Sequence, residues 1–271
     1  MSQSYNGSLR RLHIEPGNVR VSLLVILFAV TVLCTISPRV LHAQRSTRSG
    51  EIIGSLERRG RNLTALKAIM GVSTVYDRGK SRQEVRGFLL YRRPSDFRFQ
   101  GVGPAGNPLF EMVLKYNGFQ LYVPADGKIL KGGKACFARR FPDVAELEGL
   151  IPLVLLQWKG VRVISVNAEN PNGLILRFNF KGTSWRATLE PKKLLLKRLE
   201  KMGSRSVELT ADFGGYRSGK YGWLPRLFDI RSHSGGWRTV VKIGKIEINP
   251  FLVEQNFKLE PAFSAKIENC K

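Results

Sequence analysis

Strict alternation of apolar and polar residues is the feature that most limits the fold of this chain. Residues 66–76 place Leu66, Ala68, Met70 and Val72 on one side of an extended backbone, because successive side chains of a strand point to opposite faces. The pattern recurs in the next part of the chain, at residues 84–93, 97–101, 109–116 and 119–123. The turns at 117–118 and 126–127 read Asn-Gly and Asp-Gly, which are strong hairpin signals. These residues therefore predict an antiparallel meander.

The remainder of the chain adds more strands and a few helices. Strands are predicted at 161–167, 173–181, 184–190, 193–200, 205–212, about 223–232 and 237–248. Helices are predicted at 51–64, which is amphipathic, and at 143–157, where Pro152 kinks or ends the helix. Because a lone sheet must bury one face, we expect one strongly curved sheet with helices on its open side. The fold class is α+β, mainly antiparallel β with a few helices.

The first 43 residues have the character of a targeting segment. Residues 21–38 carry no charge, three arginines precede them, and Ala43 is a small residue suited to the position before a signal-peptidase cut. A cleaved export signal, a retained membrane anchor through 21–38 and lipidation at Cys34 remain open. Each alternative places the rest of the chain outside the cytoplasm. We expect a short linker at 44–50 and one domain at 51–271.

The charge of the chain favours anionic partners. The formal net charge is +23, and four of the 44 basic and one of the 21 acidic residues lie in the first 43 residues, which leaves +20 for the exported part. A strong positive field attracts nucleic acid, lipid head groups or lipopolysaccharide. Because export argues against nucleic acid, we expect an anionic membrane surface as the partner.

Two cysteines remain in the part of the chain that follows the targeting segment. Cys136 and Cys270 lie in a region expected to be exported, where disulfides form and persist. They form either one disulfide or two separate thiols, and the sequence alone does not decide between them.

The segment GVGPAG at 101–106 matches the glycine spacing of a dinucleotide-binding loop. That fingerprint requires a helix after the loop, and the residues after Pro108 alternate as a strand does. We therefore interpret the glycines as a turn between two antiparallel strands. His233 is the one histidine after the targeting segment, and no metal-ligand or nucleophile motif surrounds it. We expect no cofactor, no metal and no enzymatic activity.

Large apolar side chains at inward strand positions are the most informative residues of the chain. They either pack a core or line an apolar cavity that the curved sheet leaves unfilled. The candidates for the cavity are Phe97, Phe99, Phe110, Met112, Leu114, Leu121, Phe178, Phe180, Trp185 and Phe228. A second apolar stretch forms a candidate lid or membrane-contact segment, and its residues are Leu150, Leu153, Leu155, Leu156 and Trp158.

Four stretches of the sequence resemble the LolA/LolB-type lipoprotein carriers and their LolB-like exported relatives. They read NLTALKAIMGVSTV after the first helix, PSDFRFQGVGPAGNPLFEMV, IPLVLLQW and IEINPFLVEQNFKLEP. The resemblance covers most of residues 50–262. It implies a single half-open β-barrel with a helical lid over an apolar cavity for acyl chains, and transfer of lipids or lipid-modified proteins without covalent chemistry.

Two functional hypotheses follow from these observations. In the first, the chain is a monomeric periplasmic carrier or acceptor that binds acyl chains of lipoproteins or lipids for delivery to the outer membrane, with lipoprotein-transport machinery as a possible partner. In the second, residues 21–38 anchor an envelope sensor or interaction domain of the same fold. A hydrolase of envelope polymers would require a carboxylate pair in a cleft, and the sequence distinguishes no such pair.

Overall fold

One large sheet organises the chain. The structure is a computed structural model that describes residues 47–76, 81–94, 96–103, 105–115, 118–141, 150–169, 173–219, 222–259 and 264–270. Fourteen of its strands form one sheet in the order β16-β6-β5-β4-β3-β2-β1-β15-β14-β11-β10-β9-β8-β7. Every pairing in this sheet is antiparallel except that of β16 with β6. The predicted targeting segment 1–43 and the start of the predicted linker lie outside the described residues.

The strands fall into two halves of the chain. The first half contains β1 (Ala65–Tyr76), β2 (Ser81–Arg92), β3 (Asp96–Val102), β4 (Pro108–Lys115), β5 (Gly118–Val123) and β6 (Lys128–Gly132). The second half contains β7 (Arg162–Glu169), β8 (Gly173–Phe180), β9 (Thr183–Leu189), β10 (Leu196–Met202), β11 (Val207–Gly214), β14 (Leu227–Ser232), β15 (Arg238–Ile248) and β16 (Lys266–Asn269). A separate small hairpin is formed by β12 (Arg217–Gly219) and β13 (Gly222–Leu224).

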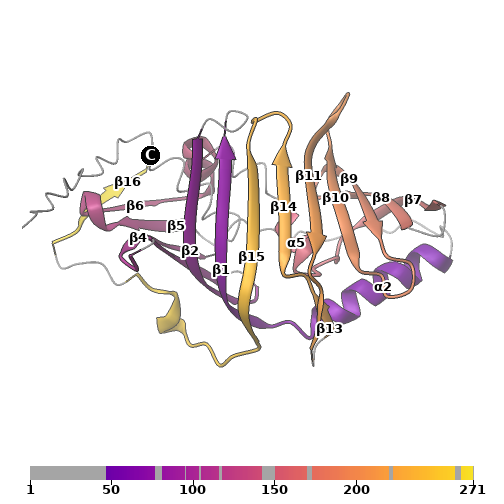
Figure 1. Cartoon of the computed structure of the whole chain (residues 1–271), viewed down its shortest axis with the longest axis horizontal. Helices are drawn as coiled ribbons and strands as arrows, with labels where there is room; N and C mark the ends of the chain where they lie inside the picture. The colour runs from indigo at the N-terminus through magenta and orange to yellow at the C-terminus, as the bar shows by residue number, and fades with distance from the viewer. Residues whose placement is uncertain are drawn as a thin grey trace, which may run out of the picture.

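The two halves are joined by the pairing of β1 with β15. This ladder runs from Leu66 opposite Ile248 to Val75 opposite Arg238. In Figure 1, β1, β2, β14 and β15 stand upright at the centre, and β4 to β6 run across behind them. The sheet is therefore strongly curved, and it stays open because its strand order ends at β16 and β7.

The helices are short and few in the described part of the chain. They are α2 (Thr47–Arg61), α3 (Lys134–Arg140) and α5 (Leu150–Val154), with single 3-10 turns η2 (Pro124–Asp126) and η3 (Glu254–Phe257). The first predicted helix thus begins four residues earlier than expected and takes in part of the predicted linker. Of the helix predicted at 143–157, residues 143–149 lie outside the described residues, α5 covers 150–154, and residues 155–157 are not helical, so the helix ends earlier than predicted.

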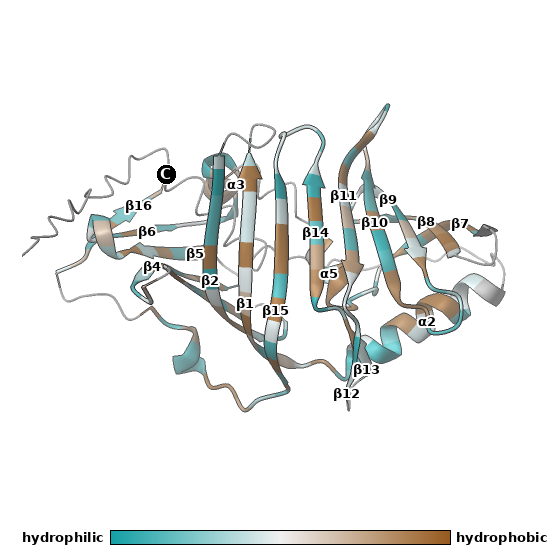
Figure 2. Ribbon diagram, in the orientation of Figure 1, coloured by the Kyte–Doolittle hydropathy of each residue, from teal (hydrophilic) through white to brown (hydrophobic). Residues whose placement is uncertain are grey.

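Alternation along the strands places the core on one face of the sheet. Hydrophobic and hydrophilic segments alternate along the strands in Figure 2, as a sheet with one buried face requires. Glycines make room for aromatic rings on that face. A Cβ atom on Gly87 would lie 2.1 Å from the Phe99 ring, and one on Gly101 would lie 2.0 Å from the Phe110 ring. Each ring therefore packs flat over the neighbouring strand at a position that only glycine leaves open.

GVGPAG lies at a strand-to-strand connection, as the sequence predicts. Gly101 belongs to β3, Gly106 has φ +82°, and β4 begins at Pro108. Backbone hydrogen bonds close the turn, from the Gly106 N–H to Gly103 and from the Gly103 N–H to Asn107, each 2.9 Å. No helix follows the glycines, so this loop lacks the helix N-terminus that a pyrophosphate requires.

A disulfide holds the last strand at the edge of the sheet. Cys136 of α3 and Cys270 are bonded, with Cα atoms 6.1 Å apart. Next to it, β16 pairs in parallel with β6 from Lys266 opposite Lys128 to Asn269 opposite Lys131. The cross-link thus fixes the C-terminal segment against α3 and β6.

The expected number of strands was too low. The sequence pattern missed β6, β12 and β16 in the described residues, and it merged β13 and β14 into one strand at about 223–232. These strands are short and carry few apolar residues; β12, for example, reads Arg-Ser-Gly. Their pairing depends on hydrogen bonds with neighbouring strands, which leave no alternation in the sequence.

Candidate functional site

An apolar cavity of about 70 Å³ lies between the sheet and the end of α5. Figure 1 shows α5 behind β14, on the concave side of the sheet. The cavity is lined by Leu63, Leu66, Met70, Leu89, Tyr91, Phe97, Val154, Leu155, Leu224, Pro225, Phe228, Val241, Ile243 and Ile246. Six of these fourteen side chains come from β1, β15 and β14, so the join between the two halves of the chain contributes one wall of the cavity.

Tyr91 supplies the one polar side chain of this lining. Its hydroxyl accepts a hydrogen bond of 2.7 Å from the Nε2 atom of Gln157. Burial raises the pKa of Tyr91 to about 12, and the nearby Arg93 only partly opposes this shift. The phenol is therefore neutral at physiological pH, and the cavity contains no ionised lining group.

The segment from Leu150 to Trp158 packs closely against α2. Leu150, Leu153 and Trp158 are fully buried, and Leu155 and Leu156 are half-buried. Leu156 adopts a left-handed φ of +59°, so its carbonyl group approaches Gly60. A Cβ atom on Gly60 would lie 1.9 Å from that carbonyl oxygen. The contact is therefore possible only because residue 60 is glycine.

The structure separates the predicted cavity residues into two groups. Phe97 and Phe228 line the cavity, and so does Leu155 from the predicted lid segment. The others do not line this cavity. Seven of them are buried in the core, namely Phe99, Phe110, Met112, Leu121, Phe178, Phe180 and Trp185, and Leu114 is partly buried beside it.

Other lining residues were not singled out from the sequence. Met70 and Leu66 were placed on the inward side of their strand, and Val241, Ile243 and Ile246 lie in a strand that was predicted correctly. Alternation identifies the face of a residue but not how deeply neighbouring strands bury it. The pairing of β1 with β15 brings these residues together, and it joins segments far apart in the sequence.

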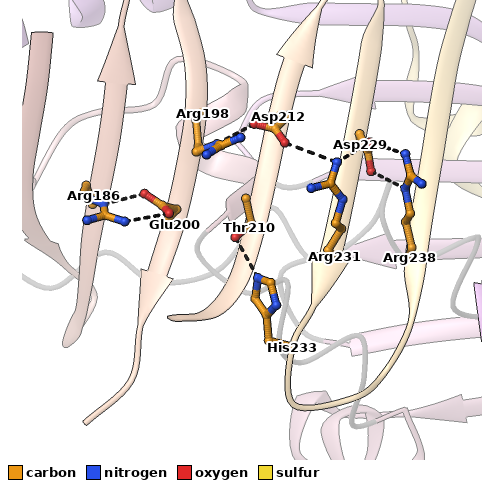
Figure 3. A network of polar contacts seen from close by, with 9 residues as sticks. All are labelled: Arg186, Arg198, Glu200, Thr210, Asp212, Asp229, Arg231, His233 and Arg238. Atoms are coloured by element: carbon orange, nitrogen blue, oxygen red, sulfur yellow. Dashed lines mark hydrogen bonds and ion pairs between the residues drawn. The ribbon is translucent and has the colours of Figure 1, made fainter. Parts of the chain in front are cut away.

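A ladder of charged side chains covers the opposite face of the second half of the sheet (Figure 3). Arg198 donates to Asp212 over 2.6 Å, and Arg231 and Arg238 donate to Asp229 over 2.8 Å and 2.6 Å. Asp229 and Arg231 alternate along β14 with the buried Phe228 and Ile230, so the ladder points away from the cavity.

The arginines of this ladder determine the ionisation of Asp229. Burial raises the pKa of Asp229, but the hydrogen bonds from Arg238 and Arg231 outweigh it and hold the pKa below its ordinary value. A similar pair joins Arg186 to Glu200 over 2.8 Å, and His233 lies 2.9 Å from Thr210. The arginines and acids of this ladder are engaged with one another as ion pairs.

Within the described residues, no group of three or more His, Cys, Asp or Glu side chains is placed to hold a metal ion. Among the same residues, no helix has both the length and the apolar character to span a membrane.

Comparison with solved structures identifies the fold. The chain is similar to a DUF1329 family protein from Desulfovibrio piger, with a TM-score of 0.61 and 12% identity over 79% of this chain and 98% of the other. It is similar to a domain named for outer membrane lipoprotein sorting from Vibrio parahaemolyticus, with a TM-score of 0.58 and 13% identity over 76% and 94%. A LolA superfamily protein from Nitrosomonas europaea matches with a TM-score of 0.56 and 8% identity over 80% and 99%.

The chain has a LolA/LolB-type fold. At these identities the likeness concerns the fold alone. Neither a protein-family model nor a curated protein sequence matches the chain. The single curved sheet is the feature that the chain shares with these structures.

Proposed function

We propose that this chain is an exported, non-enzymatic carrier that holds acyl chains of lipids or lipid-modified proteins. The observation that carries the proposal is the apolar cavity on the concave face of a LolA/LolB-type sheet. Delivery to the outer membrane, with lipoprotein-transport machinery as a partner, would follow from this activity in the periplasm. The carrier needs no catalytic group, because binding and release involve no covalent step.

Acyl chains gain affinity from every methylene that leaves water. Each buried methylene contributes about 0.8 kcal/mol, so about ten of them contribute roughly 8 kcal/mol before the cost of ordering the chain. An ionised lining group would oppose this transfer, and the lining described above contains none. The neutral Tyr91 hydroxyl is satisfied by Gln157 and does not have to be desolvated again when a chain enters.

The cavity must widen to accept a whole acyl chain. Its volume of about 70 Å³ lies well below the roughly 300–1,000 Å³ that small-molecule sites occupy. We propose that the segment from Leu150 to Trp158 is the lid that moves. Val154 and Leu155 already face the cavity, and Leu156 approaches α2 at Gly60. Once the lid moves, Phe99 and Phe110 beside Phe97 would join the lining.

Lipid content and uptake test the proposal. Lipids extracted from the purified protein are identified by mass spectrometry, and binding of a fluorescent fatty acid is titrated. Leu155→Asp places a charge in the cavity and should abolish uptake. The control variant is Leu227→Asp, which places a charge on the outer face of the sheet, where the residue is 37% exposed. Leu155→Trp, which fills the cavity without adding a charge, should also reduce uptake.

A lipid-free protein that takes up no fatty acid would contradict the proposal. If circular dichroism shows both aspartate variants to be folded, equal uptake by the two would show that the cavity is not the binding site.

A further inference from the structure

Phe251 is the most exposed large hydrophobic side chain of the described residues, at 92%. It lies in the loop between β15 and η3, two residues before Val253, which is 43% exposed. Leaving a whole aromatic ring in water forfeits the free energy that burial would supply. Such a ring is expected to have a partner that covers it.

The loop does not fold back to bury this ring, because both of its ends are fixed. The Asn249 side chain accepts hydrogen bonds from the Thr64 and Ala65 N–H groups, 2.9 Å and 3.2 Å long, and donates one of 2.7 Å to the Asn62 carbonyl. At the other end, the Val253 N–H donates to the Asn256 side chain over 2.8 Å.

Side chains from β2 and β4 hold the same loop from the side. Arg92 donates to the Leu252 carbonyl over 3.2 Å and to Glu254 over 2.7 Å, and Lys115 also pairs with Glu254. The Arg92 guanidinium lies 5.0 Å from the centre of the Phe257 ring. Phe251 is therefore presented outward by a preorganised loop.

The loop begins at the end of β15, on the side of the molecule where the strand ends lie next to the cavity. It continues directly from Ile248, which pairs with Leu66, and Leu66 and Ile246 both line the cavity. In Figure 1 this loop shares the lower edge of the molecule with the end of α2 and with β13. Leu63 after α2 and Leu224 of β13 also line the cavity, so one edge carries both the cavity and Phe251.

Basic side chains surround this edge. Arg59 of α2 donates to the carbonyl groups of Lys193 and Leu194, over 3.0 Å and 2.8 Å, which brings the turn between β9 and β10 beside α2. Lys193 in turn lies 4.0 Å from the centre of the Trp223 ring in the small hairpin.

Three cations are presented outward at this edge. Arg61 of α2, Lys192 of the turn and Arg217 of the hairpin are all exposed. Two of the nearby acids are engaged within the protein: Glu190 accepts the Lys192 and Lys193 N–H groups, 3.0 Å and 2.5 Å away, and Glu254 pairs with Arg92 and Lys115. Glu247 of β15 is exposed, so the three cations outnumber it.

We propose that the chain docks on an anionic lipid bilayer through this basic edge, defined by Arg61, Lys192, Arg217, Phe251 and Val253, with Phe251 inserted among the lipids. An aromatic ring suits the interfacial layer of a bilayer, and each basic side chain near an anionic surface adds attraction. Docking in this orientation places the cavity against the membrane. The proposal rests on the carrier function, since it gives an acyl chain a short path from bilayer to cavity.

A fluorophore at position 251 tests the docking directly. In a Cys34→Ser background of the full chain, Phe251→Cys is labelled with an environment-sensitive dye, and Phe88→Cys serves as the control. Phe88 is 45% exposed on the outer face of β2, away from the basic edge. With vesicles of phosphatidylglycerol and phosphatidylcholine that contain spin-labelled lipid, the dye at 251 should shift to the blue and be quenched. The dye at 88 should stay in water.

Three results would overturn the docking surface. They are a dye at 251 that remains unquenched, equal quenching at 251 and 88, and equal quenching with vesicles of phosphatidylcholine alone. The variant Arg61→Gln/Lys192→Gln/Arg217→Gln should raise the lipid concentration needed for half-maximal quenching by about tenfold or more; no change would remove the basic residues from the surface.

Fatty-acid uptake by the wild-type chain in vesicle-free solution separates the two proposals. Insertion of the dye at position 251 without fatty-acid uptake supports the docking surface and contradicts the carrier function. Fatty-acid uptake without insertion supports the carrier function and contradicts the docking surface.

Discussion

Gly60 offers a sharp test of how the lid is held. A Cβ atom there would lie 1.9 Å from the Leu156 carbonyl oxygen and 2.9 Å from the Leu156 Cβ atom. The first of these neighbours is backbone, so no side-chain rotation relieves the contact. The variant Gly60→Ala must therefore push α2 and the segment after α5 apart.

Two opposing terms determine the size of the effect. Replacing glycine by alanine in a helix gains about 1 kcal/mol, and overpacking costs typically about 1–3 kcal/mol. We expect a net loss of about 1 kcal/mol, or about 3 °C in Tm for a chain of this size. Gly54 in the same helix is the matched control, because its nearest neighbour is the flexible end of Arg58 at 3.5 Å. Gly54→Ala should keep the helical gain and raise Tm by about 3 °C.

Thermal unfolding followed by circular dichroism measures both variants, and stopped-flow fluorescence measures fatty-acid association. Gly60→Ala should lower Tm and bind fatty acid faster, because it displaces the lid. Gly54→Ala should leave the association rate unchanged. A Tm that rises equally in both variants refutes the close contact, and an unchanged association rate in Gly60→Ala refutes the lid.

Further predictions concern the core, the ladder, the edge and the targeting segment. Gly101→Ala should lower the free energy of unfolding in urea by about 1–3 kcal/mol, because its Cβ would meet the Phe110 ring, whereas Gly71→Ala, with open space around it, should not. Since Asp229 has a lowered pKa, wild type should be more stable than Asp229→Asn at pH 7, and this advantage should vanish as the pH falls below about 3.9; an advantage that persists in acid contradicts the ion pair. Cys136→Ser/Cys270→Ser should cost about 2–5 kcal/mol and speed hydrogen exchange in β6 and β16, measured by mass spectrometry. N-terminal sequencing of the exported protein should begin at Gln44; a retained residue 21–38 segment would favour an anchored domain instead.

The strands could be predicted where the sequence itself carries alternation. Residues 97–101 and 119–123 fall within β3 and β5, because Phe97, Phe99, Phe119 and Leu121 alternate with polar neighbours. No such signal exists for β16, which has one apolar residue, Ile267, and depends on β6 and a disulfide for its place.

The sequence predicted that an apolar cavity exists but not which residues line it. Phe99 and Phe110 were expected to line it, but Gly87 and Gly101 let their rings lie flat on the sheet, where they fill the core. How deeply a side chain is buried depends on the residues of the neighbouring strand, and the alternation within one strand does not contain that information. The lining residues from β15 reach the cavity because β15 pairs with β1, and these two strands are far apart in the sequence.

That pairing also explains why the cavity, the lid and the exposed loop occur together. β1 begins where α2 ends, and β15 ends where the loop of Phe251 begins, so the pairing of Leu66 with Ile248 brings both connections to one edge. Asn249 then ties the loop to the connection between α2 and β1. Gly60, at the end of α2, meets the lid on the concave side of the same edge. Asn249 therefore links the loop that presents Phe251 to the backbone that leads from the contact between Gly60 and Leu156 into β1.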